Sequence, residues 1–198
     1  MIKAKIDEIN YHLAAKKETL QNLKKNNPEW DIDKIYEKVG VKFRYISSDA
    51  ETSLTLGIEA AKKFSKRKLK EIDCCIFVTQ TPDYLLPNNA CIAQDILGLR
   101  KNISAFDINM GCSGYIYALS VASSFIEASI FKNVLIICGE TYTKFLNKND
   151  RATQPIFSDG GSATILKKSA SSKIGNFIFG TDGSGYEKLI FKNSGASK

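Results

Sequence analysis

The chain changes from a strand pattern to a helix pattern within residues 103–115, which read ISAFDINMGCSGY. An apolar run covers 103–108, and Gly111 and Gly114 flank Cys112. Residues with helical spacing then follow at intervals of four, three, four and four: Tyr115, Leu119, Ala122, Ile126 and Ile130. This order predicts a strand, a tight turn at the cysteine and a long helix.

The place of Cys112 at the predicted start of a helix favours a reactive thiol. Unpaired backbone N–H groups and the helix dipole at such an end favour a negative charge, and the thiolate is the nucleophilic form of cysteine. The alternative is a cysteine that only fills the core, as most free cysteines do. The flanking glycines and the helix onset lead us to expect a nucleophile.

The remaining cysteines indicate neither a metal site nor a disulfide framework. The chain has five cysteines, an odd number, and no Cys-x-x-Cys pair. Cys74 and Cys75 are neighbours in a β-like run, so their side chains should point to opposite faces of a sheet. We expect these two and Cys138 to be core residues of strands, in a reducing compartment.

The composition is that of a globular protein without a membrane segment. Hydrophobic residues make up 43% of the chain and charged residues 25%, which are ordinary values. No apolar run approaches the roughly 18–20 residues that span a bilayer. Residues 1–8 lack the apolar stretch of a signal peptide. We therefore expect a cytoplasmic protein.

The net charge of +7, from 28 basic and 21 acidic side chains, suits an acidic partner. The alternative is a solvated surface with dispersed lysines. No stripe combines basic and aromatic residues, so we expect no binding of nucleic acid.

Apolar runs that alternate with helical spacings predict an α/β fold with a parallel or mixed sheet covered on both faces. Strands are predicted at 2–13, 73–79, 103–109 and 134–138, with an antiparallel pair at 162–167 and 174–179. Helices are predicted at 20–26, 32–39, from a cap at 49 or 52 to 66, 88–97 and 113–131. Residues 159–161 and 182–185 are expected to be turns that need glycine.

Residues 106–114 resemble the nucleophile segment of the β-ketoacyl-acyl carrier protein synthase III family, within the thiolase superfamily. Five more segments resemble elements of that family in the same order: 39–44, 79–98, 134–140, 150–163 and 181–185. The first of these is similar to an early Gly-Ile-x-x-Arg element, and 134–140 to a strand that ends in Gly-Glu. Six ordered resemblances along most of the chain identify it as a member of the family.

The resemblance implies a thiolase-like half-fold: a mixed five-stranded sheet with helices on both faces and a buried central helix after Cys112. Small residues on all sides of 113–131 agree with a helix packed between layers. Residues 1–181 would form the N-terminal half-domain, and 182–198 would begin the connection to a second half that is missing here.

The resemblance also implies acyl transfer and decarboxylative Claisen condensation in fatty acid or related acyl-chain biosynthesis. Cys112 would be acylated by acyl-coenzyme A and would pass the acyl group to the carbanion of malonyl-acyl carrier protein. The implied partners are acyl-coenzyme A, acyl carrier protein and a second copy of the chain in a homodimer. Coenzyme A thioester is a substrate, and no cofactor or metal is implied.

In the family, a histidine and an asparagine from the second half work with the cysteine. The one histidine here, His12, lies in the first predicted strand and matches no family element. Family members are half as long again as these 198 residues, or longer. We expect a truncated chain, or a second polypeptide that completes the site, and weak condensation by this chain alone.

Four other site residues follow from the resemblance. Arg151 and Lys38 would lie at the nucleotide end of coenzyme A, where Lys34 replaces an aromatic residue of some relatives. Leu86 would reach the acyl pocket of the partner subunit, and Phe157 would line the tunnel to the thiol. The alternatives are a surface role for Arg151 and a core role for Phe157.

Two other functions stay open at this point. One is a superfamily acyltransferase with another acceptor, such as an amino sugar, a quinolone precursor or a second acetyl thioester. The other is a non-catalytic module for acyl-coenzyme A binding or dimerisation.

Overall fold

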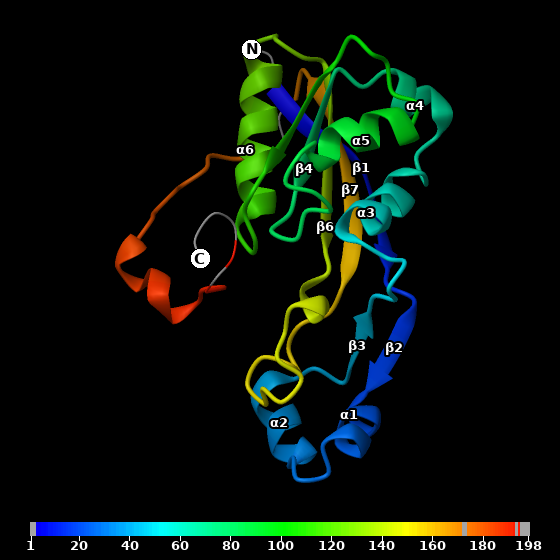
Figure 1. Ribbon diagram of the computed structural model, residues 1–198. Helices are drawn as coiled ribbons and strands as arrows, with labels where there is room; N and C mark the ends of the chain where they lie inside the picture. The colour runs from blue at the N-terminus through cyan, green and yellow to red at the C-terminus, as the bar shows by residue number, and fades with distance from the viewer. Residues whose placement is uncertain (1–2, 172–173, 193, 195–198) are drawn as a thin grey trace.

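The computed structural model, which describes residues 3–171, 174–192 and 194, is built around a five-stranded sheet with the order β1-β7-β6-β4-β5 (Figure 1). Its strands are β1 (Lys3–Leu13), β4 (Cys74–Val78), β5 (Ser104–Ile108), β6 (Asn133–Glu140) and β7 (Gly160–Ser169). β4 is parallel to β5 and β6, whereas β7 is antiparallel to β6 and β1. The predicted α/β class and mixed five-stranded sheet are confirmed.

Helices cover both faces of this sheet. The helices of the described residues are α1 (Leu20–Asn26), α2 (Ile32–Val39), α3 (Ser53–Ala61), α4 (Lys66–Lys70), α5 (Asn89–Ile96) and α6 (Gly114–Glu127), with short 3-10 turns η1 (Tyr142–Lys144) and η2 (Gly183–Lys188); of these, α1 and α2 lie apart from the sheet. In Figure 1, α6 lies on one side of the strands and α3 and α5 lie on the other. Within the described residues, every helix is too short or too polar to cross a bilayer.

Strand β4 supplies side chains to both layers because neighbouring residues in a strand point to opposite faces. Cys75 and Phe77 belong to the cluster beneath α3 and α5, whereas Cys74, Ile76 and Val78 belong to the cluster beneath α6. All five are buried, which explains why this run is apolar throughout. The predicted opposite orientation of Cys74 and Cys75 is confirmed.

Helix α6 is shorter and less buried than expected. It ends at Glu127, and its buried face includes Ala118, Ala122 and Ile126. On the opposite side, Ile116 is 48% exposed. The prediction of a buried helix therefore holds, in the described part of the chain, only for the face against the sheet.

Helix α3 packs unusually close to the sheet because glycines face it. A Cβ at Gly139 in β6 would lie 2.1 Å from Ser53 O, and one at Gly161 in β7 would lie 2.4 Å from Leu56 O. Gly160 and Gly161 were expected to form a turn with positive φ. That expectation is wrong, since both are strand residues and neither has a positive φ; Gly161 is needed for the close contact with α3.

The predicted pairing of 162–167 with 174–179 is also wrong. Both edges of β7 are occupied, by β1 on one side and β6 on the other. Residues 174–179 form neither helix nor strand, and Phe177 instead packs against the cluster beneath α6. The helix expected to reach residue 66 ends at Ala61, and Ser65 caps the separate helix α4.

A small arm projects from the main sheet, at the bottom of Figure 1. It consists of α1, α2 and an antiparallel pair that the sequence did not predict, β2 (Lys16–Thr19) and β3 (Phe43–Ile46). The two helices have the predicted bounds. Their core is formed by Leu23, Trp30, Ile32 and Ile35.

Candidate active site

The loops after β4, β5 and β6 meet because the carboxyl ends of parallel strands lie at the same edge of a sheet. Gln80 follows β4, Cys112 follows β5 and Tyr142 follows β6. The Gly111 backbone contacts both neighbouring loops: a Cβ there would lie 2.5 Å from Gln80 Oε1 and 3.5 Å from the Tyr142 hydroxyl. These three loops form the candidate active site.

Cys112 is exposed, directly before α6. The Gly114 N–H closes the turn by donating to Gly111 O at 2.8 Å. A Cβ on Gly114 would lie 2.5 Å from Val78 Cγ1, so glycine lets the helix begin directly against the end of β4. The N-cap residue, Ser113, makes no side-chain capping bond. The predicted order of strand, turn and helix around the thiol is confirmed.

Three of the other four thiols, unlike Cys112, are buried or partly buried. Burial raises the pKa of the Cys74 thiol to about 11 and that of the Cys138 thiol to about 12. Burial also raises the pKa of Cys75. Thiols of this kind stay protonated near neutral pH and are poor nucleophiles. Cys91 is exposed, like Cys112.

Glu140, at the end of β6, ties the loops of the site together. One carboxylate oxygen accepts from the Gln80 N–H at 2.6 Å, and the other accepts from the Thr81 hydroxyl at 2.8 Å. The Thr141 N–H donates to that hydroxyl at 3.1 Å, and the Tyr142 hydroxyl donates to Gln80 Oε1. Burial raises the pKa of the Glu140 carboxyl. Sequence reasoning missed this network, although the Gly-Glu end of the strand was a sign of it.

The histidine of the chain lies far from Cys112. His12 is in β1, at one edge of the sheet, and β5 forms the other edge. Four strand spacings of about 4.8 Å separate these edges, or roughly 19 Å. This placement agrees with the expectation that His12 is not part of the site.

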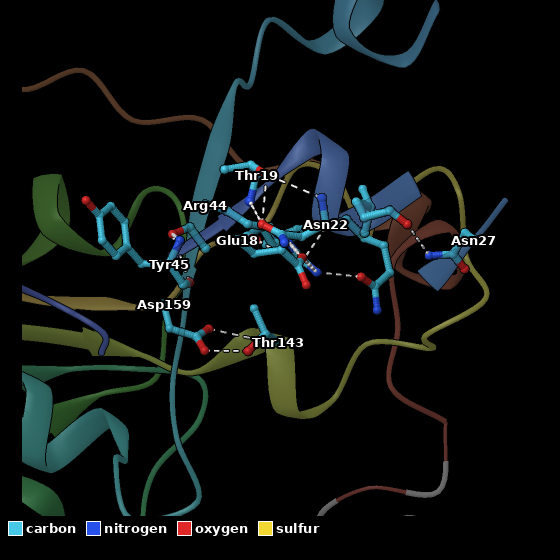
Figure 2. Close-up of polar contacts among 12 residues, drawn as sticks. Glu18, Thr19, Asn22, Asn27, Arg44, Tyr45, Thr143 and Asp159 are labelled. Atoms are coloured by element: carbon cyan, nitrogen blue, oxygen red, sulfur yellow. Dashed lines mark hydrogen bonds and ion pairs between the residues drawn. The ribbon is translucent and has the colours of Figure 1, made fainter. Parts of the chain in front are cut away.

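Arg44, the arginine of the matched 39–44 element, braces the segment that follows the site (Figure 2). Its Nε and Nη2 lie 2.7 and 2.6 Å from Glu18 Oε2. Its Nη1 and Nη2 donate to the main-chain and side-chain oxygens of Gln154, each at 2.6 Å, and Nη1 also donates to Phe157 O at 3.3 Å. Arg44 is 6% exposed and Glu18 is 5% exposed, so this buried cation is fully paired.

Asp159 is a second buried brace (Figure 2). Its carboxylate accepts from the Ser47 N–H at 2.8 Å, the Ser47 hydroxyl at 2.7 Å and the Thr143 N–H at 3.0 Å, and also from the Thr143 hydroxyl. Its own N–H donates to Tyr45 O at 2.8 Å. The segment after β6 is thereby fixed to β3.

Two of the predicted coenzyme A residues lie together on the surface. A hollow of about 460 Å³ separates α2 from the 151–152 turn. It is lined by Asp31, Lys34, Ile35, Lys38, Val39, Arg151 and Ala152. Lys34 Nζ forms an ion pair with Asp31 Oδ2 at 3.2 Å. Three cations therefore surround an apolar floor with one carboxylate, a setting that suits a phosphate-bearing ligand.

The other two predicted residues lie elsewhere. Phe157 is half-buried, and its ring lies 5.3 Å from that of Tyr142, which places it beside the candidate active site. Leu86, before the cis peptide to Pro87, is 86% exposed. Leu86 does not line the hollow beside α2.

Within the described residues, no three His, Cys, Asp or Glu side chains are grouped to hold a metal ion.

Comparisons with known proteins agree with the fold. A family model described as 3-oxoacyl-[acyl-carrier-protein (ACP)] synthase III matches residues 106–183. Beta-ketoacyl-[acyl-carrier-protein] synthase III of Chlamydia muridarum is 37% identical over 169 residues, which are 83% of this chain and 50% of that protein. The protein of the same name from Clostridium perfringens strain 13 is 45% identical over 152 residues, or 75% of this chain and 45% of that protein.

A crystal structure of 3-oxoacyl-(acyl-carrier protein) synthase from Burkholderia xenovorans LB400 has the same fold. It matches with a TM-score of 0.90 and 30% identity, over 100% of this chain and 58% of that one. The chain spans about half the length of the curated relatives it matches. Sequence and fold agree over that half: the chain belongs to the beta-ketoacyl-[acyl-carrier-protein] synthase III family of the thiolase superfamily.

Proposed function

We propose that this chain performs the acylation step of a 3-oxoacyl-[acyl-carrier-protein] synthase III, with Cys112 as the nucleophile. The observation that carries the proposal is the exposed thiol at the junction of β5 and α6. Its neighbours Gln80 and Tyr142 come from the ends of two adjacent strands, and ligand sites of open α/β sheets lie at such strand ends.

In this step the Cys112 thiolate attacks the thioester carbon of acyl-coenzyme A. A bond forms between that carbon and the cysteine sulfur, and the bond to the coenzyme A sulfur breaks. Coenzyme A leaves as a thiolate and takes up the proton that Cys112 released. Main-chain N–H groups at the start of α6 support the proposal, because such donors stabilise a tetrahedral oxyanion. The bound acyl group remains electrophilic.

The hollow beside α2 is the proposed site of the nucleotide end of coenzyme A. Lys34, Lys38 and Arg151 line this hollow, so the phosphates of coenzyme A would meet positive charge there. Phe157, packed on Tyr142, is proposed to line the passage to the thiol.

For the condensation step, malonyl-acyl carrier protein loses carbon dioxide and its carbanion attacks the acyl carbon. The bond to the Cys112 sulfur breaks and the thiolate is restored. This step needs donors to the enolate oxygen, and His12 lies across the sheet from Cys112. Because each such donor typically contributes about 10²–10³-fold, we expect the 198-residue chain alone to form β-ketoacyl product near the background rate. The proposed location of this reaction is the cytoplasm.

The proposed assembly is a homodimer. Strand β5 is at the edge of the sheet, and an open edge strand readily pairs with another chain. The loop before α5 exposes Leu85 and Leu86 by 89% and 86%, so it suits burial against a second copy.

Titration of the purified chain with acetyl-coenzyme A tests the substrate class. Lys38→Ala and Arg151→Ala should each weaken binding about tenfold, the effect of one charged hydrogen bond. Lys148→Ala is the matched control, since Lys148 is exposed nearby but does not line the hollow. Equal affinity in all four proteins would overturn the proposed nucleotide site.

A further inference from the structure

Gln80 and Tyr142 form a hydrogen-bonded pair directly on the turn that carries Cys112. The Tyr142 hydroxyl donates to Gln80 Oε1. These two oxygens are also the ones that face Gly111, where a Cβ would lie 2.5 Å from the first and 3.5 Å from the second. Because Gly111 immediately precedes Cys112, the pair contacts the backbone of the nucleophile's turn.

Both members of the pair are held by other groups. The Gln80 main chain is fixed by its N–H bond of 2.6 Å to Glu140. The Tyr142 ring packs on Phe157, with centroids 5.3 Å apart, and on Phe191 at 6.2 Å. Burial raises the pKa of Tyr142, and the nearby charges of Glu140 and Cys112 raise it further. The hydroxyl is therefore a protonated donor near neutral pH.

We propose that Gln80 and Tyr142 act as one positioning unit for Cys112, a role that rests on its proposed function as nucleophile. The hydroxyl fixes the orientation of the Gln80 amide over Gly111. On the other side of the turn, Gly114 packs against Val78. The turn is thus clamped between the pair and the end of β4, which keeps the sulfur at the start of α6. Without this hydrogen bond, the Gln80 amide is free to rotate, and the turn loses the contact between that amide and Gly111.

The test uses Tyr142→Phe, which keeps the ring on Phe157, and Gln80→Met, which removes the acceptor at similar length. Alkylation of Cys112 by iodoacetamide and its acylation by acetyl-coenzyme A are followed by peptide mass spectrometry. Each variant should react about two to ten times more slowly, the range of one hydrogen bond. The double variant should be no slower than the slower single variant, because both changes remove the same interaction. The maximal acylation rate should fall, and the acetyl-coenzyme A concentration for half-maximal rate should stay constant.

Tyr115→Phe is the matched control, because it also removes a half-buried hydroxyl contact, to Thr164 Oγ1 at 3.2 Å. It should lower the melting temperature as much as Tyr142→Phe does and leave the Cys112 rates unchanged. Unchanged rates in Tyr142→Phe, additive losses in the double variant, or an equal loss in Tyr115→Phe would overturn the proposal. If the two single variants slow the alkylation of Cys112 but no protein, wild type included, is acylated, the positioning role is supported and the proposed function fails.

Discussion

Arg44 donates hydrogen bonds to both the main-chain and the side-chain oxygen of Gln154, each 2.6 Å long, across 110 residues of sequence. Through this contact β3 holds the segment on which Arg151 and Phe157 lie. The buried partner Glu18 balances the charge. The arginine of the matched 39–44 element thus acts here as a brace for the candidate site.

Replacing Arg44 by Met should destabilise the chain by about 3–5 kcal/mol, since it leaves the buried Glu18 carboxylate unpaired. Urea unfolding measures this change. Lys62→Met is the control, because the Lys62–Glu59 pair is exposed and such pairs contribute about 0–1 kcal/mol. Similar stabilities of the two variants would contradict the bracing role.

Cys112 should be the thiol that iodoacetamide labels first. Burial raises the pKa of Cys74 to about 11 and of Cys138 to about 12, so these thiols are almost fully protonated at pH 7. Cys91 is the informative comparison because it is exposed but does not precede α6 in the site. Peptide mapping after limited labelling gives the order, and faster labelling of Cys91 would refute the assignment.

Gly161→Ala should destabilise the fold by about 1–3 kcal/mol, the usual cost of overpacking. The added Cβ would lie 2.4 Å from Leu56 O and 2.6 Å from Gly57 N, and backbone atoms of α3 cannot move aside as a flexible side chain can. Gly175→Ala is the control, with no atom within 4 Å of its Cβ. Equal melting temperatures would show that α3 does not pack as described.

Light scattering at tens of micromolar should show a dimer that Leu86→Asp weakens. The side chain of Leu86 is 86% exposed, and a carboxylate there would be buried at the proposed interface. Ile178→Asp is the control, at a side chain that is 95% exposed outside β5 and the Leu86 loop. A stable monomer of the wild-type chain would contradict the proposed assembly.

Elements with strong local signals were predictable from the sequence. The apolar run of β4, the cap Asn88 with Gly98 beyond α5, and the bounds of α1 and α2 all depend on nearby residues. The pair β2 and β3 was not predictable, because its short strands alternate weakly and depend on the contact of Arg44 with Glu18. Sequence also cannot distinguish a glycine in a turn from one such as Gly161, which is required by a helix distant in sequence.

The candidate site was predicted in part. The setting of Cys112 follows from local pattern, and the grouping of Lys38 with Arg151 followed from the family resemblance. The Glu140, Gln80 and Tyr142 network depends on which strands are neighbours in the sheet, which single residues do not reveal.

Peptide mass spectrometry of the chain after incubation with acetyl-coenzyme A tests the central claim most directly. We predict an acetyl adduct on the peptide that contains Cys112, formed by the wild type and absent from Cys112→Ser. Cys91→Ser should be acetylated like the wild type. A folded wild-type chain with no adduct on Cys112, or with its adduct on Cys91, would contradict the account.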